Sequence, residues 1–387
     1  MNREGGSIRE SQKRKPVLLF VCNHFLPGRK AGGPLVSLLR IISLFSSDAH
    51  VYVLTKDRDF EDANTYPNIV VDRLNYCEGI AVFYVRSIAG VLRCLRSLNP
   101  DVVYFNSFFS PFSFVSQLAC LALAPKARRI LAPRGELGIG ALKIKAYRKR
   151  LFVRVFRSLG MQRMLKFQAT SESEAADIGR ELREPAVVVP NIPARMPSAP
   201  RRRVKFPGKG KLIYLSRITR KKNLHLALIA LSSLSNCEIE FDIFGPIEDT
   251  KYWRECMREV AEIPSTIRIR YLGAIHPREV TKVLPQYHAL FLPTANENYG
   301  HTIFEALQHG VLPLISDQTP WRNLTSLDIG WDVSLSDPQH LIWALEQFLG
   351  LNQEEFDRKT LNAMHFASTR IDFDSLCGTY HDLFGIG

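Results

Sequence analysis

Two glutamates, Glu297 and Glu305, stand eight positions apart in the segment PTANENYGHTIFEALQHG, residues 293–310. The run HALFLPT predicts a buried strand, and GHTIFEALQHG predicts a helix that begins near Gly300. The free amides and positive dipole end of a helix N-terminus attract phosphate, and carboxylate oxygens accept hydrogen bonds from sugar hydroxyls. The segment therefore predicts a site for a phosphorylated sugar. Alternatively, Glu297 only complements the helix dipole and Glu305 is solvated.

A second segment, YLSRITRKKNLHLAL, supplies two cations after the first strand expected in the second half of the chain. Arg217 would stand at the carboxyl end of that strand, and Lys222 at the start of the next helix. Charge grows on a nucleoside diphosphate when the glycosidic bond to it breaks, and fixed cations stabilise that charge. Together with the two glutamates, these cations predict a site for a nucleotide-linked sugar.

A third segment, PGRKAGGPLVSLL, places a turn at Gly32 and Gly33 between the first strand of the chain and a helix. Glycine lets a phosphate approach the backbone closely, so this turn is a candidate phosphate-binding loop. It is neither a GxGxxG nor a Walker sequence, and the alternative is a turn that only begins the helix.

Short apolar and β-branched runs alternate with helical patterns along the chain, which is typical of βα units on parallel sheets. The strand runs of the first half are PVLLFVC, HVYVLT, IAVFYV, DVVYFN, RRILAP, FQATS and AVVVPN. Those of the second half are KLIYLS, IEFDIFG, IRIRYLG, HALFLPT and GVLPLIS. We expect an α/β protein of two doubly wound, Rossmann-like domains that face each other across a ligand-binding cleft.

The domain boundaries are predicted from composition. Residues 1–15 form a flexible basic leader, and residues 16–190 form the first domain, which the family resemblance given below implies is the acceptor-side domain. The segment 191–210, rich in Pro, Arg and Gly, is the linker. Residues 211–365 form the nucleotide-sugar-binding domain, and residues 366–387 form a terminal helix that returns to the first domain.

The net charge of +13 is concentrated in the first half of the chain. Up to Pro190 there are 29 Lys and Arg against 16 Asp and Glu, whereas both groups number 22 thereafter. No acid occurs between Leu137 and Ser171, and the basic face expected there comprises Lys143, Lys145, Arg148, Lys149 and Arg150. Such a face attracts phospholipid, a phosphorylated acceptor or nucleic acid, unless it is an ordinary solvated helix face.

Residues 141–159, within this stretch, have apolar side chains at helical spacing with basic residues between them. One amphipathic helix of this kind could lie on an acidic bilayer or pack its apolar stripe against the sheet. The apolar positions are Leu142, Tyr147, Leu151, Phe152, Val155 and Phe156. Nucleic acid is not an expected partner, because interleaved aromatic residues, zinc-ligand spacing and a helix-turn-helix pattern are missing from the sequence.

Other features of the sequence predict a cytoplasmic location. No apolar run ends in a small-residue cleavage site, and the most membrane-like stretch, SPFSFVSQLACLALA, is shorter than the roughly 20 residues that a span needs. The seven cysteines are scattered and form no CxxC pair. We interpret Asp57 and Asp59, in KDRDF, as an acid pair in a loop and expect no metal site.

In combination, these segments resemble those of the family 4 glycosyltransferases, which are retaining enzymes of the GT-B fold. Residues 297–305 resemble the E-x7-E element of that family, SRITRKKN its Arg-x4-Lys element, and KAGGP its glycine loop. The segments DQTPWRNL and LAPRGELGIGALKIKAYRKRLF also resemble a bacterial surface-polysaccharide branch. The resemblance runs along the chain from about Pro16.

The resemblance implies a role for each of these residues. Glu297 would contact the donor sugar, Glu305 the ribose, and Arg217 with Lys222 the diphosphate. Glu297, Arg217 and Lys222 would form the catalytic set. The other donor-binding positions are Gly32, Gly33, Tyr299, Gly300, His301 and Thr302. Many relatives also use a histidine of the first domain as a sugar contact, for which His24 is the candidate here unless its role is structural. Arg134 could contact the acceptor or the donor instead, and Asn106 is a further candidate.

The same resemblance implies a hexosyltransferase that needs neither metal nor cofactor. The leaving phosphate would take the proton of the acceptor, which attacks from the same face. The partners would be a nucleotide sugar, a lipid-linked or oligosaccharide acceptor of cell-surface polysaccharide synthesis, and the anionic cytoplasmic face of the inner membrane. The alternative is a nucleotide-sugar epimerase of the same fold, against which the acid-free basic stretch argues.

Overall fold

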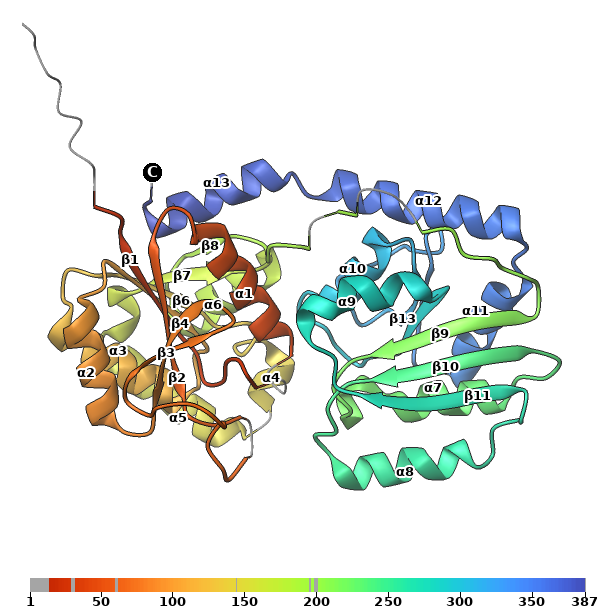
Figure 1. Ribbon diagram of the computed structural model, residues 1–387, viewed down its shortest axis with the longest axis horizontal. Helices are drawn as coiled ribbons and strands as arrows, with labels where there is room; N and C mark the ends of the chain where they lie inside the picture. Colours follow the sequence, from red (N-terminus) through yellow and green to blue (C-terminus); the bar gives the residue numbers. More distant parts are fainter. Residues whose placement is uncertain are drawn as a thin grey trace, which may run out of the picture.

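The computed structural model describes residues 14–28, 32–59, 62–143, 145–194, 196–197 and 201–386. The predicted leader, residues 1–15, lies outside the described residues except for its last two. The chain forms two α/β domains that lie side by side (Figure 1), which confirms the predicted fold class.

The first domain is built on an eight-stranded sheet in the order β3-β4-β2-β1-β5-β6-β7-β8. Its strands are β1 (Val17–Val21), β2 (His50–Lys56), β3 (Leu74–Cys77), β4 (Ile80–Val85), β5 (Val102–Asn106), β6 (Arg128–Ala132), β7 (Lys166–Ala169) and β8 (Ala186–Val188). All neighbours pair in parallel except β3 and β4. The sequence analysis missed β3, because this edge strand is short and half of its residues are exposed.

Helices cover both faces of this sheet. They are α1 (Gly33–Phe45), α2 (Ile88–Leu98), α3 (Pro111–Leu123), α4 (Ile139–Lys143), α5 (Ala146–Ser158) and α6 (Glu172–Leu182). Successive side chains of a strand point to opposite faces, so Leu18 and Phe20 of β1 enter the core formed with α1. Leu19 and Val21 enter the core formed with α2, α3, α5 and α6. Burial on both faces explains why β1 is a continuous apolar run.

The second domain has a fully parallel six-stranded sheet in the order β11-β10-β9-β12-β13-β14. Its strands are β9 (Lys209–Leu215), β10 (Glu238–Phe244), β11 (Ile267–Gly273), β12 (Ala289–Leu292), β13 (Leu312–Ser316) and β14 (Trp331–Val333). Its helices are α7 (Leu224–Ser232), α8 (Thr250–Val260), α9 (Pro277–Val283), α10 (His301–Gln308) and α11 (Pro338–Gly350). The three-residue β14 was not predicted from the sequence.

Strand order reverses once in each domain, between β1 and β5 in the first sheet and between β9 and β12 in the second. Open α/β sheets bind ligands outside the carboxyl ends of the strands at such a reversal. The loops after β1 and β9 carry the glycine turn and the cation pair that the sequence analysis singled out. The topology therefore directs both toward the space between the domains.

Two segments connect the domains. In the linker region, the buried Arg203 donates hydrogen bonds to the backbone oxygens of Tyr287, His309 and Gly310, at 3.0, 3.3 and 2.6 Å. After α11, helix α12 (Gln353–Arg370) packs against α10 of the second domain.

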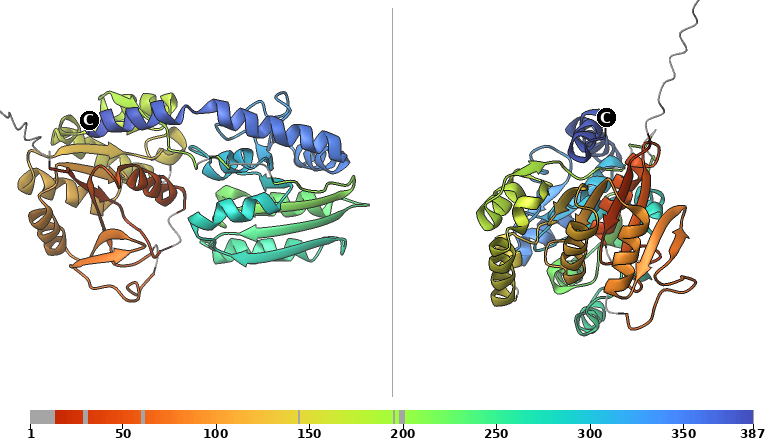
Figure 2. Two further views of the ribbon diagram at one scale, coloured as in Figure 1. Left: turned by 45° about the horizontal axis from the view of Figure 1, so that its top comes forward. Right: turned by 90° about the vertical axis from the view of Figure 1, so that its left-hand side faces the viewer.

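Helix α13 (Phe373–Phe384) then lies against the first domain, as Figures 1 and 2 show from three directions. Its Phe384 ring stacks on Tyr104 of β5 with centroids 5.6 Å apart. The C-terminal segment therefore belongs to the core of the first domain.

The amphipathic helix predicted for residues 141–159 is not one continuous helix. Helix α4 ends at Lys143, and α5 begins at Ala146 after Lys145, which adopts a left-handed backbone conformation with φ 55°. Such a residue ends a helix, so α4 and α5 can take different directions. Within the described part of the chain, no helix is both long and apolar enough to span a bilayer.

Candidate active site

A cleft with a volume of about 1060 Å³ lies between the two domains. Its walls come from the segments that follow β1, β6, β9 and β12 and from the first turn of α1. The ten residues predicted to bind the donor all line it: Gly32, Gly33, Arg217, Lys222, Glu297, Tyr299, Gly300, His301, Thr302 and Glu305. The structure therefore brings together three segments that are far apart in the sequence.

The two loops that carry Lys222 and Glu297 are held together by their backbones. The amide of Ala295 donates to Lys221 O at 2.8 Å, and Asn223 Nδ2 donates to Pro293 O at 2.9 Å. Lys222 closes the short 3₁₀ turn η2 (Arg220–Lys222), and its ammonium group is ion-paired with Glu297. The Lys222 side chain is only 8% exposed, so its charge acts in a partly desolvated environment.

Arg217 provides the second cation of the cleft. Its Nη1 donates to both carboxylate oxygens of Glu248, at 2.8 and 3.2 Å, and its side chain is 42% exposed. This pairing holds the guanidinium at the carboxyl end of β9. A guanidinium group presents five donors, so Arg217 keeps free N–H groups for an anion in the cleft.

The first turn of α10 forms the wall beside these cations. Gly300 precedes the helix with φ 75°, a left-handed conformation that favours glycine. A Cβ atom at this position would lie 3.1 Å from Trp321 Nε1, which donates to Tyr299 O at 2.6 Å. Since the first amides of a helix lack intrahelical partners, the amides around His301 and Thr302 can bind an anion.

The glycine turn of the first domain lies directly against the second domain. Gly32 has φ 61° and ψ −139°, and a Cβ atom on it would lie 3.3 Å from Arg217 Cδ. A Cβ atom on Gly33 would lie 3.8 Å from His301 Cδ2. A larger residue at position 32 would be strained by this backbone conformation and would require Arg217 to shift by a few tenths of an ångström, so glycine is favoured here mainly for its conformation.

A network that was not predicted joins the domains behind this turn. Arg40 of α1 is ion-paired with Glu305 of α10, and its Nη1 contacts His301 Nδ1 at 3.1 Å and Ile192 O at 3.0 Å. Ser37 Oγ contacts His301 Nε2 at 2.6 Å. The first domain thus contributes two groups to this network, the guanidinium of Arg40 and the hydroxyl group of Ser37, one helical turn apart on α1.

The network fixes the protonation state of His301. Since a guanidinium can only donate, His301 Nδ1 accepts from Arg40, and the proton must lie on Nε2, which donates to Ser37 Oγ. Burial, reinforced by the charges of Arg40 and Arg134, holds the pKa of His301 well below its ordinary value. His301 is therefore a neutral group in the cleft wall.

Glu305 lies in the cleft wall, as predicted, but its carboxylate is already engaged. Burial raises its pKa, and the charge of Arg40 opposes this shift. Arg40 takes Oε1, whereas Oε2 forms no hydrogen bond with any residue that the structure describes. One carboxylate oxygen thus remains as an acceptor for a ligand hydroxyl group.

Of the three first-domain candidates for a sugar contact, only Arg134 lines the cleft. Its guanidinium donates to Asn106 Oδ1 at 2.8 Å, to Tyr104 Oη at 2.6 Å and to Asn191. Asn106 is therefore buried behind Arg134 and serves to position it.

His24 also lies outside the cleft lining. Its Nδ1 contacts Arg58 O at 3.1 Å, and burial lowers the pKa of the ring. This contact with the segment after β2 keeps the imidazole out of the cleft, although His24 lies close to the end of β1.

The five residues of the predicted basic face separate into three groups. Lys143, Lys145 and Arg148 are exposed and line neither the cleft nor the second pocket described below. Arg150 lines that second pocket. Lys149 turns inward, where its Nζ donates to Ala141 O at 2.7 Å and lies 4.9 Å from the centroid of the Phe109 ring. The prediction of one continuous face is corrected for Lys149, which borders the cleft.

Arg40 and Ser37 are the functional residues that the sequence analysis missed. They are the polar positions of a helix, GPLVSLLRIISLF, that is otherwise almost entirely apolar on its buried side. A cation in such a helix requires a partner, because a buried charge is stable only when paired. That signal was available in the sequence, but it does not identify the partner.

No group of three or more His, Cys, Asp or Glu residues suited to a metal ion occurs in the described ranges. Asp57 of the KDRDF segment instead pairs with Arg58 at 3.0 Å and with Arg86 at 2.8 Å. Both contacts place this buried acid in an ion-pair cluster with two partly exposed arginines.

Comparison with known proteins agrees with this geometry. Residues 197–363 match the family "Glycosyl transferases group 1". A search of curated protein sequences gives no significant match.

Solved structures with the same architecture cover nearly the whole chain. HepE from Anabaena, in complex with UDP and glucose, is 14% identical with a TM-score of 0.69 over 96% of this chain and 99% of its own. WaaG, a glycosyltransferase involved in lipopolysaccharide biosynthesis, is 15% identical with a TM-score of 0.66, over 96% and 100% of the chains. A TarM variant from S. aureus, in complex with UDP, Fondaparinux and alpha-GlcNAc-glycerol, is 10% identical with a TM-score of 0.69, over 95% and 99%. The second domain therefore resembles the glycosyl transferases group 1 family, and the whole chain has the two-domain GT-B fold.

Proposed function

We propose that this protein transfers a sugar, with retention of anomeric configuration, from a nucleoside-diphosphate sugar to a saccharide or lipid-linked acceptor. The observation that carries the proposal is the gathering of all ten candidate donor-binding residues, from both domains, in one cleft. The complexes of HepE with UDP and glucose and with UDP-glucose support the choice of a nucleotide sugar. The lipopolysaccharide role of WaaG supports a surface-glycan pathway.

The diphosphate would bind between the first turn of α10 and two cations of the cleft lining, Lys222 and Arg217. Lys222 is held by Glu297 and Arg217 by Glu248, so both charges are fixed before the donor arrives. Preorganised charges of this kind stabilise the charge that develops on the leaving phosphate without reorganising during the reaction. Glu297, beside Lys222, is then placed to accept hydrogen bonds from hydroxyl groups of the donor sugar.

The ribose would bind to Glu305. Its Oε2 has no partner among the described residues, and Arg40 keeps the carboxylate oriented through Oε1. His301, being neutral, contributes its amide rather than a charge. The departing phosphate would accept the proton of the acceptor, so the described cleft residues serve to bind and orient rather than to attack.

The acceptor would approach from the first domain at an acidic membrane surface. Tyr147, Leu151 and Val155 of α5 are 80, 46 and 43% exposed, and they stand four residues apart on one helix face. Exposed basic residues, including Arg148 and Lys145, flank this ridge. A row of exposed apolar side chains between cations suits the interface of a bilayer that carries anionic lipids.

The direct test is an assay for release of nucleoside diphosphate from a panel of nucleotide sugars, with and without membrane-extracted lipid acceptors. We expect one donor to be turned over and the transferred sugar to keep its anomeric configuration, as judged from NMR couplings of the product. Inversion would contradict the proposed retention. Epimerisation of a nucleotide sugar in the absence of any acceptor product would contradict transfer itself.

A further inference from the structure

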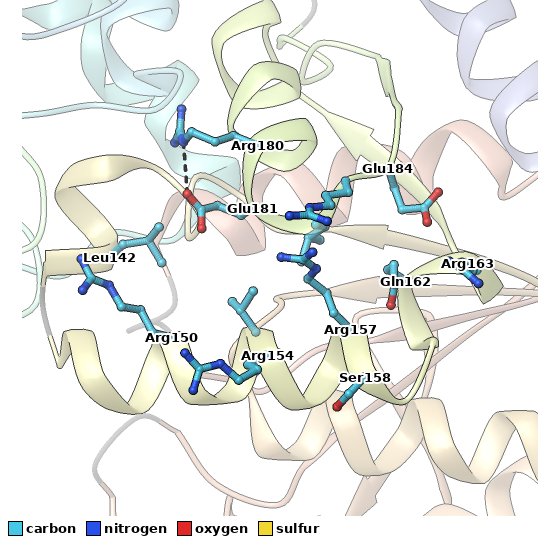
Figure 3. Close-up of a pocket in the computed structure, with 13 residues that line it drawn as sticks. Leu142, Arg150, Arg154, Arg157, Ser158, Gln162, Arg163, Arg180, Glu181 and Glu184 are labelled. Carbon is cyan, nitrogen blue, oxygen red and sulfur yellow. Dashed lines mark hydrogen bonds and ion pairs between the residues drawn. The ribbon is translucent and has the colours of Figure 1, made fainter.

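A second pocket, with a volume of about 660 Å³, lies outside the cleft on the first domain. It is formed by α5, the 3₁₀ turn η1 (Met161–Met164) and the C-terminal part of α6, and Figure 3 shows its side chains. Its lining shares no residue with the lining of the cleft. We call it the arginine pocket, after the residues that dominate it: Arg150, Arg154, Arg157, Arg163, Arg180 and Arg183.

The arginine pocket has an uncompensated positive charge. Two acids, Glu181 and Glu184, accompany the six arginines of its lining. Within the described part of the chain, Arg180 alone among the six has an ion pair, with Asp177 and with Glu181, the latter at 3.1 Å and drawn as the dashed line in Figure 3. Like charges that converge without partners attract an anion, and guanidinium groups bind phosphate oxygens in pairs.

The arrangement of these arginines follows from helical spacing. Arg150, Arg154 and Arg157 stand four and three residues apart on α5, so they project from one face of the helix. Figure 3 shows them in a row on that helix, opposite Arg180 of α6. Arg183 follows α6 in a left-handed conformation with φ 58°, which ends the helix beside the row.

An unsatisfied polar group lies in the same pocket. Gln162 is 7% exposed, and its Oε1 is buried with no hydrogen-bond partner among the residues that the structure describes. Buried polar atoms in proteins are almost always paired, so this oxygen is expected where a water or a ligand hydroxyl group completes the site. The pocket wall therefore contains a buried polar oxygen without a described partner, next to donors that can bind a phosphate.

The surroundings of the arginine pocket indicate an amphiphile. The exposed ridge of Tyr147, Leu151 and Val155 adjoins the arginine row on the same helix, α5. Inside the pocket, Val153 and Leu182 are buried apolar residues of the wall. A ligand with a phosphate head and an apolar tail could place the head among the arginines and the tail along the ridge.

We propose that the arginine pocket binds the phosphate group of an anionic lipid. In the proposed function, on which its catalytic relevance rests, this phosphate would belong to the acceptor. The two sites share the helix α6, since Asp177 lines the cleft and Arg180, one turn later and ion-paired with it, lines the pocket. A lipid-linked phosphate held at Arg180 therefore lies next to the acceptor side of the cleft.

The test is a titration of the full chain with monomeric short-chain phosphatidylglycerol, followed by NMR or calorimetry. The variant Arg154→Gln/Arg157→Gln/Arg183→Gln should bind at least about tenfold more weakly, because each charge-assisted hydrogen bond to phosphate contributes substantially. The matched control Arg73→Gln/Arg96→Gln/Lys126→Gln removes the same charge from exposed positions on other elements of the first domain, outside the pocket. It should weaken binding by less than about threefold, since exposed charges are screened.

Further arms make the outcome decisive. Arg157→Lys keeps the charge but loses paired donation to phosphate, so it should fall between the wild type and the triple variant. Glu184→Gln removes a negative charge that repels the lipid phosphate, so it should tighten lipid binding. Equal losses in the triple variant and its matched control would overturn the proposal, because binding would then be diffuse attraction. Inorganic pyrophosphate that binds the arginine pocket as tightly as the lipid would overturn the assignment to an amphiphile.

Folding of the triple variant is checked by far-UV circular dichroism, and its spectrum must match that of the wild type. If the triple variant does not fold, Arg157→Lys and Glu184→Gln alone must still shift affinity in opposite directions, or the proposal fails. UDP binding separates this inference from the proposed function. A chain that binds the lipid at these arginines but no nucleotide would refute the proposed transfer and retain the lipid site.

Discussion

The two cations proposed to bind the diphosphate, Lys222 and Arg217, are paired with carboxylates, whereas most of the arginines in the arginine pocket have no ion pair with any described residue. Lys222 is nearly buried and is ion-paired with Glu297, and Arg217 donates hydrogen bonds to both carboxylate oxygens of Glu248. In the arginine pocket, Arg154 is exposed and has no ion pair with any described residue. A cation fixed by an acid has one position and suits one defined ligand, while an unpaired one adapts to any phosphate that approaches.

This difference predicts how strongly each region responds to substitution. Electrostatic interactions are strong where water is excluded and weak where it screens them. Loss of a paired cation also leaves its acid without a partner, which adds a desolvation cost. Substitutions in the cleft should therefore have large effects that are insensitive to salt. Substitutions of exposed basic residues of the first domain should have small effects that depend on salt.

The largest effect is expected for Lys222→Ala. It removes a buried charge from the proposed leaving phosphate, and turnover should fall by about 10²–10³-fold, the usual loss for one preorganised stabilising group. Arg220→Ala is the matched control, because Arg220 shares the turn η2 but pairs with Glu255 outside the cleft. Similar turnover in the two variants would contradict a role for Lys222 in stabilising the leaving phosphate.

The next effect concerns the pair between the domains. Arg40→Ala leaves the buried Glu305 without its cation, which should lower the free energy of unfolding by about 3 kcal/mol. Glu305→Gln in the Arg40→Ala background should recover part of that loss, because it removes the unpaired charge. Chemical denaturation of both variants measures the difference. Additive effects of the two substitutions would show that the pair is not coupled.

A smaller effect is expected at the exposed basic residues. Reversing charge at Lys145 and Arg148 should weaken binding to vesicles that contain phosphatidylglycerol by at least about tenfold, at roughly 1 kcal/mol per basic residue near an acidic surface. Raising the salt concentration should shrink this difference, while nucleotide binding should stay unchanged. Vesicle sedimentation at two salt concentrations checks both points. Undiminished binding of the variant would leave this surface without a membrane role.

The smallest effect is a dependence of stability on pH. The pKa of His301 is lower in the folded protein than in the unfolded chain, so the folded state holds fewer protons. The contribution of His301 to the free energy of unfolding is complete above pH 6.5. It is lost as the pH falls below that value, by at most about 1.4 kcal/mol per pH unit. His301→Asn should reduce this slope without abolishing it, since the pKa values of His24 and His309 are also lowered. If the free energy of unfolding, measured in urea from pH 7.5 to 5, had the same slope against pH in the wild type and in His301→Asn, the neutral state assigned to His301 would be contradicted.

Much of the fold could be predicted because its signals are local. Buried parallel strands are continuous apolar runs, and the helix starting beside Gly300 has a start signal that a single segment carries. The short β3 and β14 escaped, because their stabilisation comes from pairing with a neighbour and not from their own composition. The break at Lys145 escaped too, since the apolar spacing runs through it without interruption.

The candidate site divides in the same way. The cleft residues of the second domain could be predicted because their segments are short and follow neighbouring strands. The Arg40–Glu305 pair joins residues 265 positions apart, so no local pattern reveals it. His24 illustrates the converse error, since position after a strand does not decide which way a side chain turns.

The most direct test of the central claim is a thermal-shift titration of the protein with UDP, GDP and ADP. A ligand that binds only the folded state raises the midpoint with concentration, so at least one nucleotide should stabilise the wild type and the Arg220→Ala variant. The Lys222→Ala variant should lose most of that shift at the same concentration. No shift with any nucleoside diphosphate, or an equal shift in the Lys222→Ala variant, would contradict a diphosphate site in this cleft.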